Sequence, residues 1–417
     1  MIETNEKISH IMKRKLSIIF GFVFIDLLGY SLILPLLPYI AERFNATPTQ
    51  VGLLLTANAL AQMIAAPAIG RLSDRWGRRP MLILSVAGTV VSFLLFATAN
   101  SLLMLFISRI LDGLLGGNTA LARAYITDIT DDENRSKGLG LIGAAFGLGF
   151  IIGPFSGGQL SRLGYMVPGL VAAALSFINL IAVVFWIPET LTEEQKQAAL
   201  KSKYTKFNFR NLMDTIRIPC LGQLLLVNTW FSLAFMLFQV NFVLVAKESL
   251  NLSAQTTSLL LSLVGVMSVI TQGLIVGRIS KRIRETRLMF YSTLILIVGM
   301  LGWGFARTIW QIILVIIPIA ISAGIFNVSL TSLLTKSTYR ESVGGTLGLA
   351  QSQQTFAQVV TPLMGGPLIQ YFGGYAVGVL AAGLLGISAL IESISLSRIP
   401  DPHGPCSHAE MTDQALV

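Results

Sequence analysis

Residues 70–80 read GRLSDRWGRRP, and this polar stretch stands between two long apolar runs. A related stretch, GRISKR, occupies residues 277–282, about 207 positions later. A second pair of similar stretches, GPFSGGQL at 153–160 and TPLMGGPL at 361–368, is separated by nearly the same interval. Two matches at one interval are harder to obtain by chance than a single match. The sequence therefore predicts two related halves, as in transporters built from structural repeats.

The 417-residue chain is mostly apolar, with 53% hydrophobic and only 12% charged residues. Water-soluble domains carry roughly 25% charged residues, so this chain cannot cover a water-facing surface of its size. Its apolar runs reach the roughly 20 residues that a helix needs to cross a bilayer. We expect an all-α membrane protein whose twelve transmembrane helices form two pseudo-symmetric six-helix bundles. The expected spans are about 16–40, 51–70, 80–99, 101–122, 137–160, 166–187, 219–245, 256–277, 287–306, 309–334, 342–370 and 374–396.

The 30 Lys and Arg residues fall unevenly on the connections between these spans. About 25 lie on the side that holds both termini, and this excess marks the cytoplasmic side. The expected order is a cytoplasmic N-tail (1–15), an N-terminal bundle (16–187), a cytoplasmic linker (188–218), a C-terminal bundle (219–396) and a cytoplasmic C-tail (397–417). The net charge of +9 is thus an orientation signal and not a nucleic-acid patch. The membrane is expected to be the plasma or bacterial inner membrane, with an organelle membrane as the alternative.

Several function classes are disfavoured by what the sequence lacks. Its two cysteines and three histidines form no metal-binding or disulfide pattern, and the histidines all lie in the tails. There is no nucleotide-binding fingerprint and no nucleophile–base constellation, so we expect neither an ATP-driven pump nor an enzyme. We expect no cofactor and no metal, and the expected partners are a small organic substrate, protons and the lipid bilayer around a monomer.

The stretch at 70–80 resembles the signature between the second and third helices of the major facilitator superfamily. The resemblance implies a conformational latch in which Asp74 faces the positive end of the eleventh helix, near Gly344, and Arg78 bridges to Asp128. The second-half copy has Lys281 in place of Asp74 and is expected to lack this latch. The alternative is a plain basic loop. The latch residues are expected to be Gly70, Asp74, Arg75, Gly77, Arg78 and Asp128.

The stretch RILDGLLGGN, residues 109–118, resembles the family motif with an arginine in the middle of the membrane. Charged residues at that depth are costly and usually functional. Arg109 and Asp112 stand three residues apart on one helical face and can pair with each other. A purely structural ion pair is the alternative reading.

The stretch GLGFIIGPFSGG, residues 147–158, resembles the antiporter signature of drug:proton antiporters. Small residues four apart let helix backbones approach closely, so ordinary tight packing is an equal alternative. The residues that carry the match are Gly149, Gly153, Pro154, Gly157 and Gly158.

Asp26 is the only carboxylate in the first expected helix. Because an isolated aspartate cannot face lipid, it should face a cavity or a partner. The surrounding FIDLLGYSLILPLLP resembles the first helix of tetracycline:proton exporters, which makes Asp26 the first candidate for proton coupling, with Arg109 and Asp112 beside it. A hydrogen-bonded structural aspartate is the alternative.

The second half offers mostly neutral polar residues inside the expected membrane core. Asn241, Gln351, Gln354 and Gln358 are candidates for a substrate path, and interhelical hydrogen bonding is the alternative. Phe231, Phe235 and Phe238 are expected to be packing residues rather than a drug pocket. Glu392 is expected near the cytoplasmic end of a peripheral helix, a poor place for coupling.

Together these patterns favour a secondary transporter that exports small amphipathic organic solutes in exchange for protons. The second hypothesis is an uncoupled facilitator or a symporter of a metabolite on the same fold. The third is a non-transporting membrane sensor or scaffold, which would have no need of a latch.

Overall fold

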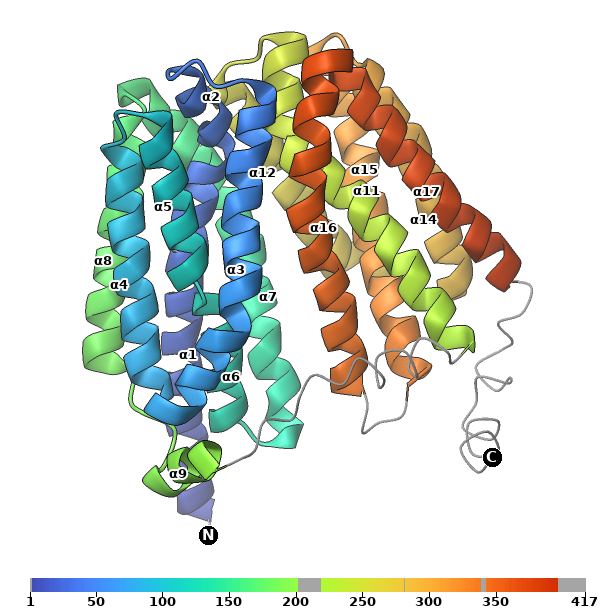
Figure 1. Ribbon diagram of the computed structural model, residues 1–417. Coiled ribbons are helices and arrows are strands. Elements are labelled where there is room, and N and C mark those ends of the chain that lie inside the picture. The colour runs from blue at the N-terminus through green and yellow to red at the C-terminus, as the bar shows by residue number, and fades with distance from the viewer. Residues whose placement is uncertain (1, 202–218, 281, 339–342, 397–417) are drawn as a thin grey trace. The chain divides into compact units, whose positions relative to one another are not determined.

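A computed structural model describes residues 2–201, 219–280, 282–338 and 343–396. Within these ranges the chain is helical throughout and contains no strand (Figure 1). The contacts between residues divide it into two compact units, Met1–Tyr204 with Leu252–Gly265, and Thr205–Asn251 with Val266–Val417. The expected all-α membrane fold is confirmed.

The first unit holds the helices up to residue 201 and the start of α12. In chain order these are α1 (Ile2–Ile33), η1 (Leu34–Leu36), α2 (Leu37–Glu42), α3 (Pro48–Trp76), α4 (Arg78–Ala97), α5 (Leu102–Leu115), α6 (Asn118–Ile129), α7 (Asp132–Leu160), η2 (Ser161–Leu163), α8 (Met166–Trp186) and α9 (Glu193–Lys201). Within this unit α1 packs chiefly on α7 and α8, and α4 packs on α5 and α8.

The second unit holds the remaining helices. They are α11 (Pro219–Leu250), the end of α12 (Ala254–Ile270), the π-helical turn η3 (Thr271–Ile275), α13 (Val276–Ile279), α14 (Glu285–Phe305), α15 (Ile309–Lys336), α16 (Val343–Phe372) and α17 (Gly374–Leu396). Here α14 packs on α15 and α17, while α11 packs on α16 and α17.

Among the described residues, eleven helical segments are long and apolar enough to cross a membrane. The expected span at 342–370 corresponds to α16, which has 30 residues but is not among the eleven. Its sequence carries the glutamines Gln351, Gln353, Gln354 and Gln358, which lower its mean hydropathy. Length alone therefore supports this helix as the twelfth span.

One expected boundary is wrong. The helix α1 begins at Ile2 and includes most of the residues expected to form the N-tail, while the apolar span begins at Leu16. The fourth span is longer than expected, reaching Ile129, and it is broken in the middle. Its break lies at Gly116 and Gly117, where the backbone leaves helical geometry between α5 and α6. Consecutive glycines end a helix readily because they lose the most conformational freedom when ordered.

The repeat predicted from the sequence recurs in the turns that enter α3 and α12. Asn45 and Asn251 both have positive φ, 54° and 51°, a conformation that asparagine tolerates better than most residues. Two residues later a hydroxyl caps the next helix: Thr47 Oγ1 accepts from the Gln50 amide at 3.3 Å, and Ser253 Oγ accepts from the Thr256 amide at 3.3 Å. The same turn chemistry thus opens the second helix of each half.

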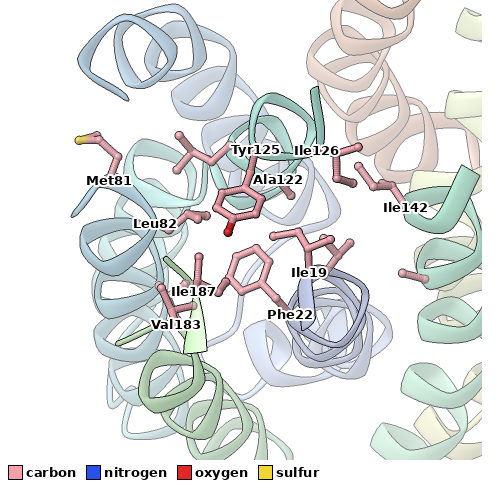
Figure 2. Packing of buried hydrophobic residues seen from close by; sticks show 14 of the residues in the cluster. Ile19, Phe22, Met81, Leu82, Ala122, Tyr125, Ile126, Ile142, Val183 and Ile187 are labelled. Carbon is pink, nitrogen blue, oxygen red and sulfur yellow. The ribbon is translucent and has the colours of Figure 1, made fainter. Parts of the chain in front are cut away.

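A cluster of buried apolar side chains joins one end of α1, α4, α6, α7 and α8 in the first unit (Figure 2). Tyr125 of α6 lies in its centre, and its hydroxyl donates to the carbonyl oxygen of Pro188 at 3.2 Å. Between helices that share a membrane, such packing stabilises through van der Waals contact rather than through removal of apolar surface from water. This core fixes the ends of α4, α6 and α8, and those ends carry the polar network described next.

Candidate coupling site and polar network

The turn between α3 and α4 consists of one residue, Gly77. The stretch GRLSDRW forms the last two turns of α3 rather than a loop, so Gly70, expected among the latch residues, lies inside the helix. Gly77 has a φ of 106°, which L residues rarely adopt, and a Cβ atom there would overlap the carboxylate of Glu189. A glycine is therefore required at position 77 and not at position 70, whose Cβ would meet open space.

Arg78, the first residue of α4, is the centre of an ion-pair network and is 8% exposed. Its Nε donates to Asp128 Oδ2 at 2.8 Å, which is the contact expected from the sequence. Its Nη1 lies 2.7 Å from Asp74 Oδ1 and donates to Ser73 Oγ at 2.6 Å. Thr190 Oγ1 also donates to Asp128 at 3.0 Å. The network thus ties α3, α4 and α6 to the chain that follows α8.

Glu189 completes this network, although no motif in the sequence singled it out. Its Oε1 accepts from the backbone N–H of Arg78 at 2.9 Å, and its Oε2 accepts from that of Arg79 at 3.2 Å. Burial alone would raise the pKa of this carboxyl. The backbone N–H bonds from Leu191, Arg78, Thr190 and Arg79 outweigh that effect and lower its pKa below the ordinary value. The carboxylate therefore caps the positive end of α4.

The expected contact of Asp74 with the start of the eleventh helix would link one unit to the other. Residues 339–342, which precede that helix, lie outside the described ranges. The latch therefore stays a prediction. Arg75 occupies the last turn of α3.

The second unit has its own ion pair at the matching place, with the charges exchanged. Glu285 is the first residue of α14, as Arg78 is of α4, and Lys336 is the last residue of α15. Lys336 Nζ lies 2.8 Å from Glu285 Oε1, and Ser332 Oγ donates to the same oxygen at 2.8 Å. Here the acid lies at a helix N-terminus and the base at a C-terminus, the arrangement that helix dipoles favour. Lys281 lies outside the described ranges.

Asp26, the expected proton-coupling residue on α1, contacts a neutral partner. Asn118 Nδ2 lies 2.5 Å from Asp26 Oδ1 and also 3.2 Å from Thr89 Oγ1 of α4. Asn118 is the first residue of α6, directly after the break in the fourth span, and is 2% exposed. The other amide atom of this side chain, Oδ1, has no hydrogen-bond partner among the described residues. The sequence motif included Asn118 but gave no sign of this contact.

Arg109 and Asp112 of α5 form the expected pair, at 3.4 Å between Nη1 and Oδ2. Both are buried, and Asn58 of α3 donates to Asp112 Oδ2 at 3.0 Å. The Arg109 guanidinium also lies 4.9 Å from the Phe96 ring centroid, a cation–π distance. Asp112 therefore has a cation beside it, whereas the partner of Asp26 is an amide.

Side chains from α3 and α4 donate to carbonyl groups at the break in the fourth span. Ser85 Oγ donates to the carbonyl oxygen of Leu115, and Gln62 Nε2 donates to that of Gly116 at 3.4 Å. Free backbone groups are tolerated at membrane depth only when neighbours satisfy them. The break is therefore built into the unit and holds Asn118 opposite Asp26.

The antiporter-like stretch of α7 packs against α1 through three buried glycines four residues apart. A Cβ at Gly149 would lie 3.1 Å from Leu27 Cβ, while one at Gly153 or Gly157 would overlap Ser31 Oγ or the Leu32 carbonyl oxygen. Ser31 Oγ donates to the Gly149 carbonyl at 2.8 Å. Pro154 is buried inside α7, and Gly158 instead packs on Ser258 of α12. This close packing fixes the helix that carries Asp26.

The four substrate-path candidates fall in different environments. Asn241 is 1% exposed, donates to the Leu237 and Thr361 carbonyls, and fills the space beside Gly365. Asn241 therefore links α11 to α16 through a hydrogen bond. Gln351 is exposed and donates to Gln354 at 3.1 Å, and Gln358 is half-buried. Phe231 and Phe238 are buried packing residues, as expected.

The site as a whole brings together carboxylates, amides, hydroxyls and guanidinium groups. In the part of the chain that the structure describes, no cluster of His, Cys, Asp and Glu could hold a metal ion. Chemically, the arrangement can bind and release protons at carboxylates and can hold helix ends through charge pairs.

Comparison of the sequence with known proteins identifies a family. Residues 19–337 match the family model described as Major Facilitator Superfamily, and residues 224–414 give a second match. The chain is 29% identical to the class C tetracycline resistance protein of Escherichia coli over 355 residues, which cover 84% of this chain and 88% of that protein. It is 29% identical to solute carrier family 22 member 18 of Mus musculus over 346 residues, 81% of this chain and 85% of the mouse protein.

Solved structures give the same fold. The crystal structure of a human organic anion transporter aligns with a TM-score of 0.67 and 22% identity, covering 91% of this chain and 99% of that chain. A bacterial homologue of the human lysosomal transporter Spinster aligns with a TM-score of 0.72 and 15% identity, covering 92% and 96%. The family match confirms the resemblance to the major facilitator superfamily that the stretch at 70–80 indicated.

Proposed function

The chain belongs to the major facilitator superfamily, and from this premise we propose that it exports small amphipathic organic solutes in exchange for protons. Proton-coupled antiport is the finer part of this proposal. Its support comes from the class C tetracycline resistance protein as a relative and from the surroundings of Asp26.

One observation carries the proposal: the contrast between the two intramembrane aspartates of the first unit. Asp112 has the guanidinium of Arg109 beside it and an amide from Asn58. Asp26 has the amide of Asn118, and no basic side chain among the described residues forms an ion pair with it. A nearby cation favours the charged form of a carboxylate, so an aspartate without one is the better proton carrier. We therefore assign proton exchange to Asp26 and a fixed charge to the Arg109–Asp112 pair.

In this mechanism a proton and a substrate compete for the surroundings of Asp26. The glycine-packed contact between α1 and α7 holds the aspartate in place while the transporter changes state. The Arg78–Asp128–Asp74 network acts at the ends of α3, α4 and α6, where contacts must form and break as access alternates. We place both tails and the linker on the cytoplasmic side because of the distribution of Lys and Arg.

The test is substrate-induced proton release from purified protein in weak buffer, with a panel of amphipathic compounds. We expect release from the wild type, none from Asp26→Asn, and retained release from Glu193→Gln, an exposed charge change on α9. Unchanged release from Asp26→Asn with lost release from Asp112→Asn would move the proton site to α5. Substrate binding without any release from the wild type would support an uncoupled facilitator instead.

A further inference from the structure

Glu392 of α17 is enclosed where this helix packs against α14 in the second unit. The residue is 1% exposed, although it stands near the end of the apolar span Gly374–Ile394. Thr293 Oγ1 of α14 lies 2.9 Å from Oε1 and 3.1 Å from Oε2 of its carboxyl group. Ser388 Oγ, one turn earlier on α17, lies 2.8 Å from Oε1. Both hydroxyl-bearing residues are fully buried.

No cation accompanies this carboxyl group in the part of the chain that the structure describes. The helices α11, α14 and α16 pack on α17, and α16 carries no charged residue. The nearest basic residue of α14 in sequence is Arg287, six residues before Thr293 and thus about 9 Å along the axis. Arg287 is exposed. The other charged residues on these helices are Glu285 at the start of α14 and Lys247 and Glu248 in the last turn of α11.

An ionised carboxylate in this place would face apolar side chains with only two hydroxyl donors. Taking such a charge away from water without a counter-ion is costly, and buried groups of this kind become neutral instead. The neutral acid meets no such penalty. Oε2 can donate its proton to Thr293 Oγ1, and Thr293 can donate its own proton to the Met289 carbonyl oxygen, 3.1 Å away. Ser388 donates to Oε1, so every polar hydrogen of the cluster has an acceptor.

We propose that Glu392 is a proton-binding site, separate from Asp26, whose bound proton links α17 to α14. The proposal does not depend on proton-coupled transport, because it follows from burial and hydrogen bonding within the second unit. When the proton leaves, a carboxylate remains between two helices with no counter-ion beside it. The contact between α14 and α17 then weakens, and the stability of this unit falls as the pH rises. Glu392 is therefore a pH-sensitive element of the second bundle.

Infrared difference spectroscopy of the purified full chain tests this directly, because a protonated carboxyl group has its own carbonyl stretching band. We expect such a band at neutral pH in the wild type, its loss in Glu392→Gln, and its retention in Asp26→Asn and in Glu248→Gln, a control on α11. Thr293→Val should shift the band without removing it, because the acid loses its hydrogen-bond acceptor. An unchanged spectrum in Glu392→Gln, or a band present only at acidic pH, would overturn the proposal.

Thermal unfolding across pH gives a second measurement. The wild type should lose stability as the pH rises from the ordinary glutamate pKa of about 4.3 to the pH at which Glu392 loses its proton in the folded protein, whereas Glu392→Gln, which mimics the neutral acid, should show no such loss. Glu392→Ala should be less stable than Glu392→Gln at every pH, because it removes the acceptor of the Ser388 hydroxyl and leaves a cavity between α14 and α17. If Glu392→Gln retains the pH-dependent loss of the wild type, the proton is bound elsewhere and the proposal is wrong.

Discussion

The carboxylate of Asp26 and the amide of Asn118 lie 2.5 Å apart, across 92 residues of sequence. The contact joins α1, two turns before its end, to the first residue of α6, immediately after the break in the fourth span. The position of the Asn118 amide beside Asp26 thus depends on the break between α5 and α6.

Removing the Asn118 amide should change the pH dependence of transport. A hydrogen-bond donor to a carboxylate favours its charged form, so Asn118→Ala favours the protonated form of Asp26. The pH of half-maximal uptake into inverted vesicles should therefore move upward. Asn179→Ala is the matched control, because Asn179 is buried and donates to the Phe22 carbonyl of α1 rather than to Asp26. Equal shifts in both variants would mean that the effect comes from packing on α1.

Arg78 should contribute more to stability than its partner Asp74. Hydrogen bonds to charged groups contribute about 1.5–3 kcal/mol, so Arg78→Gln should lower the free energy of unfolding by that order. Asp74 is 48% exposed in its side chain, and exposed pairs contribute only about 0.2–1 kcal/mol. Asp74→Asn should therefore remain folded and yet transport poorly, because its expected role is in the conformational change. Thermal unfolding and initial transport rates separate the two effects, and wild-type rates in Asp74→Asn would refute the latch.

The cap that Glu189 forms on α4 should fail at acidic pH. Its pKa is lower in the folded protein than the ordinary value of 4.5, because four backbone N–H groups donate to it. A lowered folded-state pKa means that the stabilisation is present above the ordinary value and is lost as the pH falls through the folded value. Glu189→Gln should therefore be less stable than the wild type at neutral pH and should lose less stability on acidification. Glu194→Gln, on the exposed start of α9, is the control. Parallel acid profiles for the wild type and Glu189→Gln would contradict the cap.

The glycines of α7 should differ sharply in their tolerance of a methyl group. Gly153→Ala and Gly157→Ala introduce a Cβ into space held by Ser31 and Leu32, and overpacking of this kind costs about 1–3 kcal/mol. Gly143→Ala, on the same helix, meets open space and should be neutral or slightly stabilising. Thermal unfolding of the three variants checks the contrast. Equal effects at positions 143 and 153 would show that α7 does not pack on α1 in this way.

Exchanging the charges of Glu285 and Lys336 should rescue only part of the loss from either single change. The pair is partly exposed, so its coupling energy in a double-mutant cycle should stay within about 1 kcal/mol. The exchanged pair restores the attraction but places each charge at the helix end that the dipole disfavours, at about 0.3–1 kcal/mol per charge. Full rescue by the double variant would show that the helix ends have no influence here.

The features that depend on neighbours along the chain could be predicted from the amino-acid sequence. Apolar length and charge distribution gave the helices, the interval of about 207 residues gave the two halves, and spacing placed Arg109 beside Asp112. The glycines of α7 were also recognisable, because a repeat of four residues marks one helix face. The pair of Arg78 and Asp128 joins helices far apart in sequence, and the family motif predicted it.

Only the tertiary structure decided which polar groups meet across helices. Asn118 belongs to a helix broken at two glycines, and its contact with Asp26 depends on how α6 lies against α1. Glu189 reaches the start of α4 because α8 ends beside it, and Asn241 is buried because α16 offers a glycine there. Glu392 was expected near the cytoplasmic end of a peripheral helix, and only the packing of α14 on α17 shows that it is buried there. Periodicity encodes the face of one helix, whereas the partner of that face is set by packing between helices, which no local pattern records.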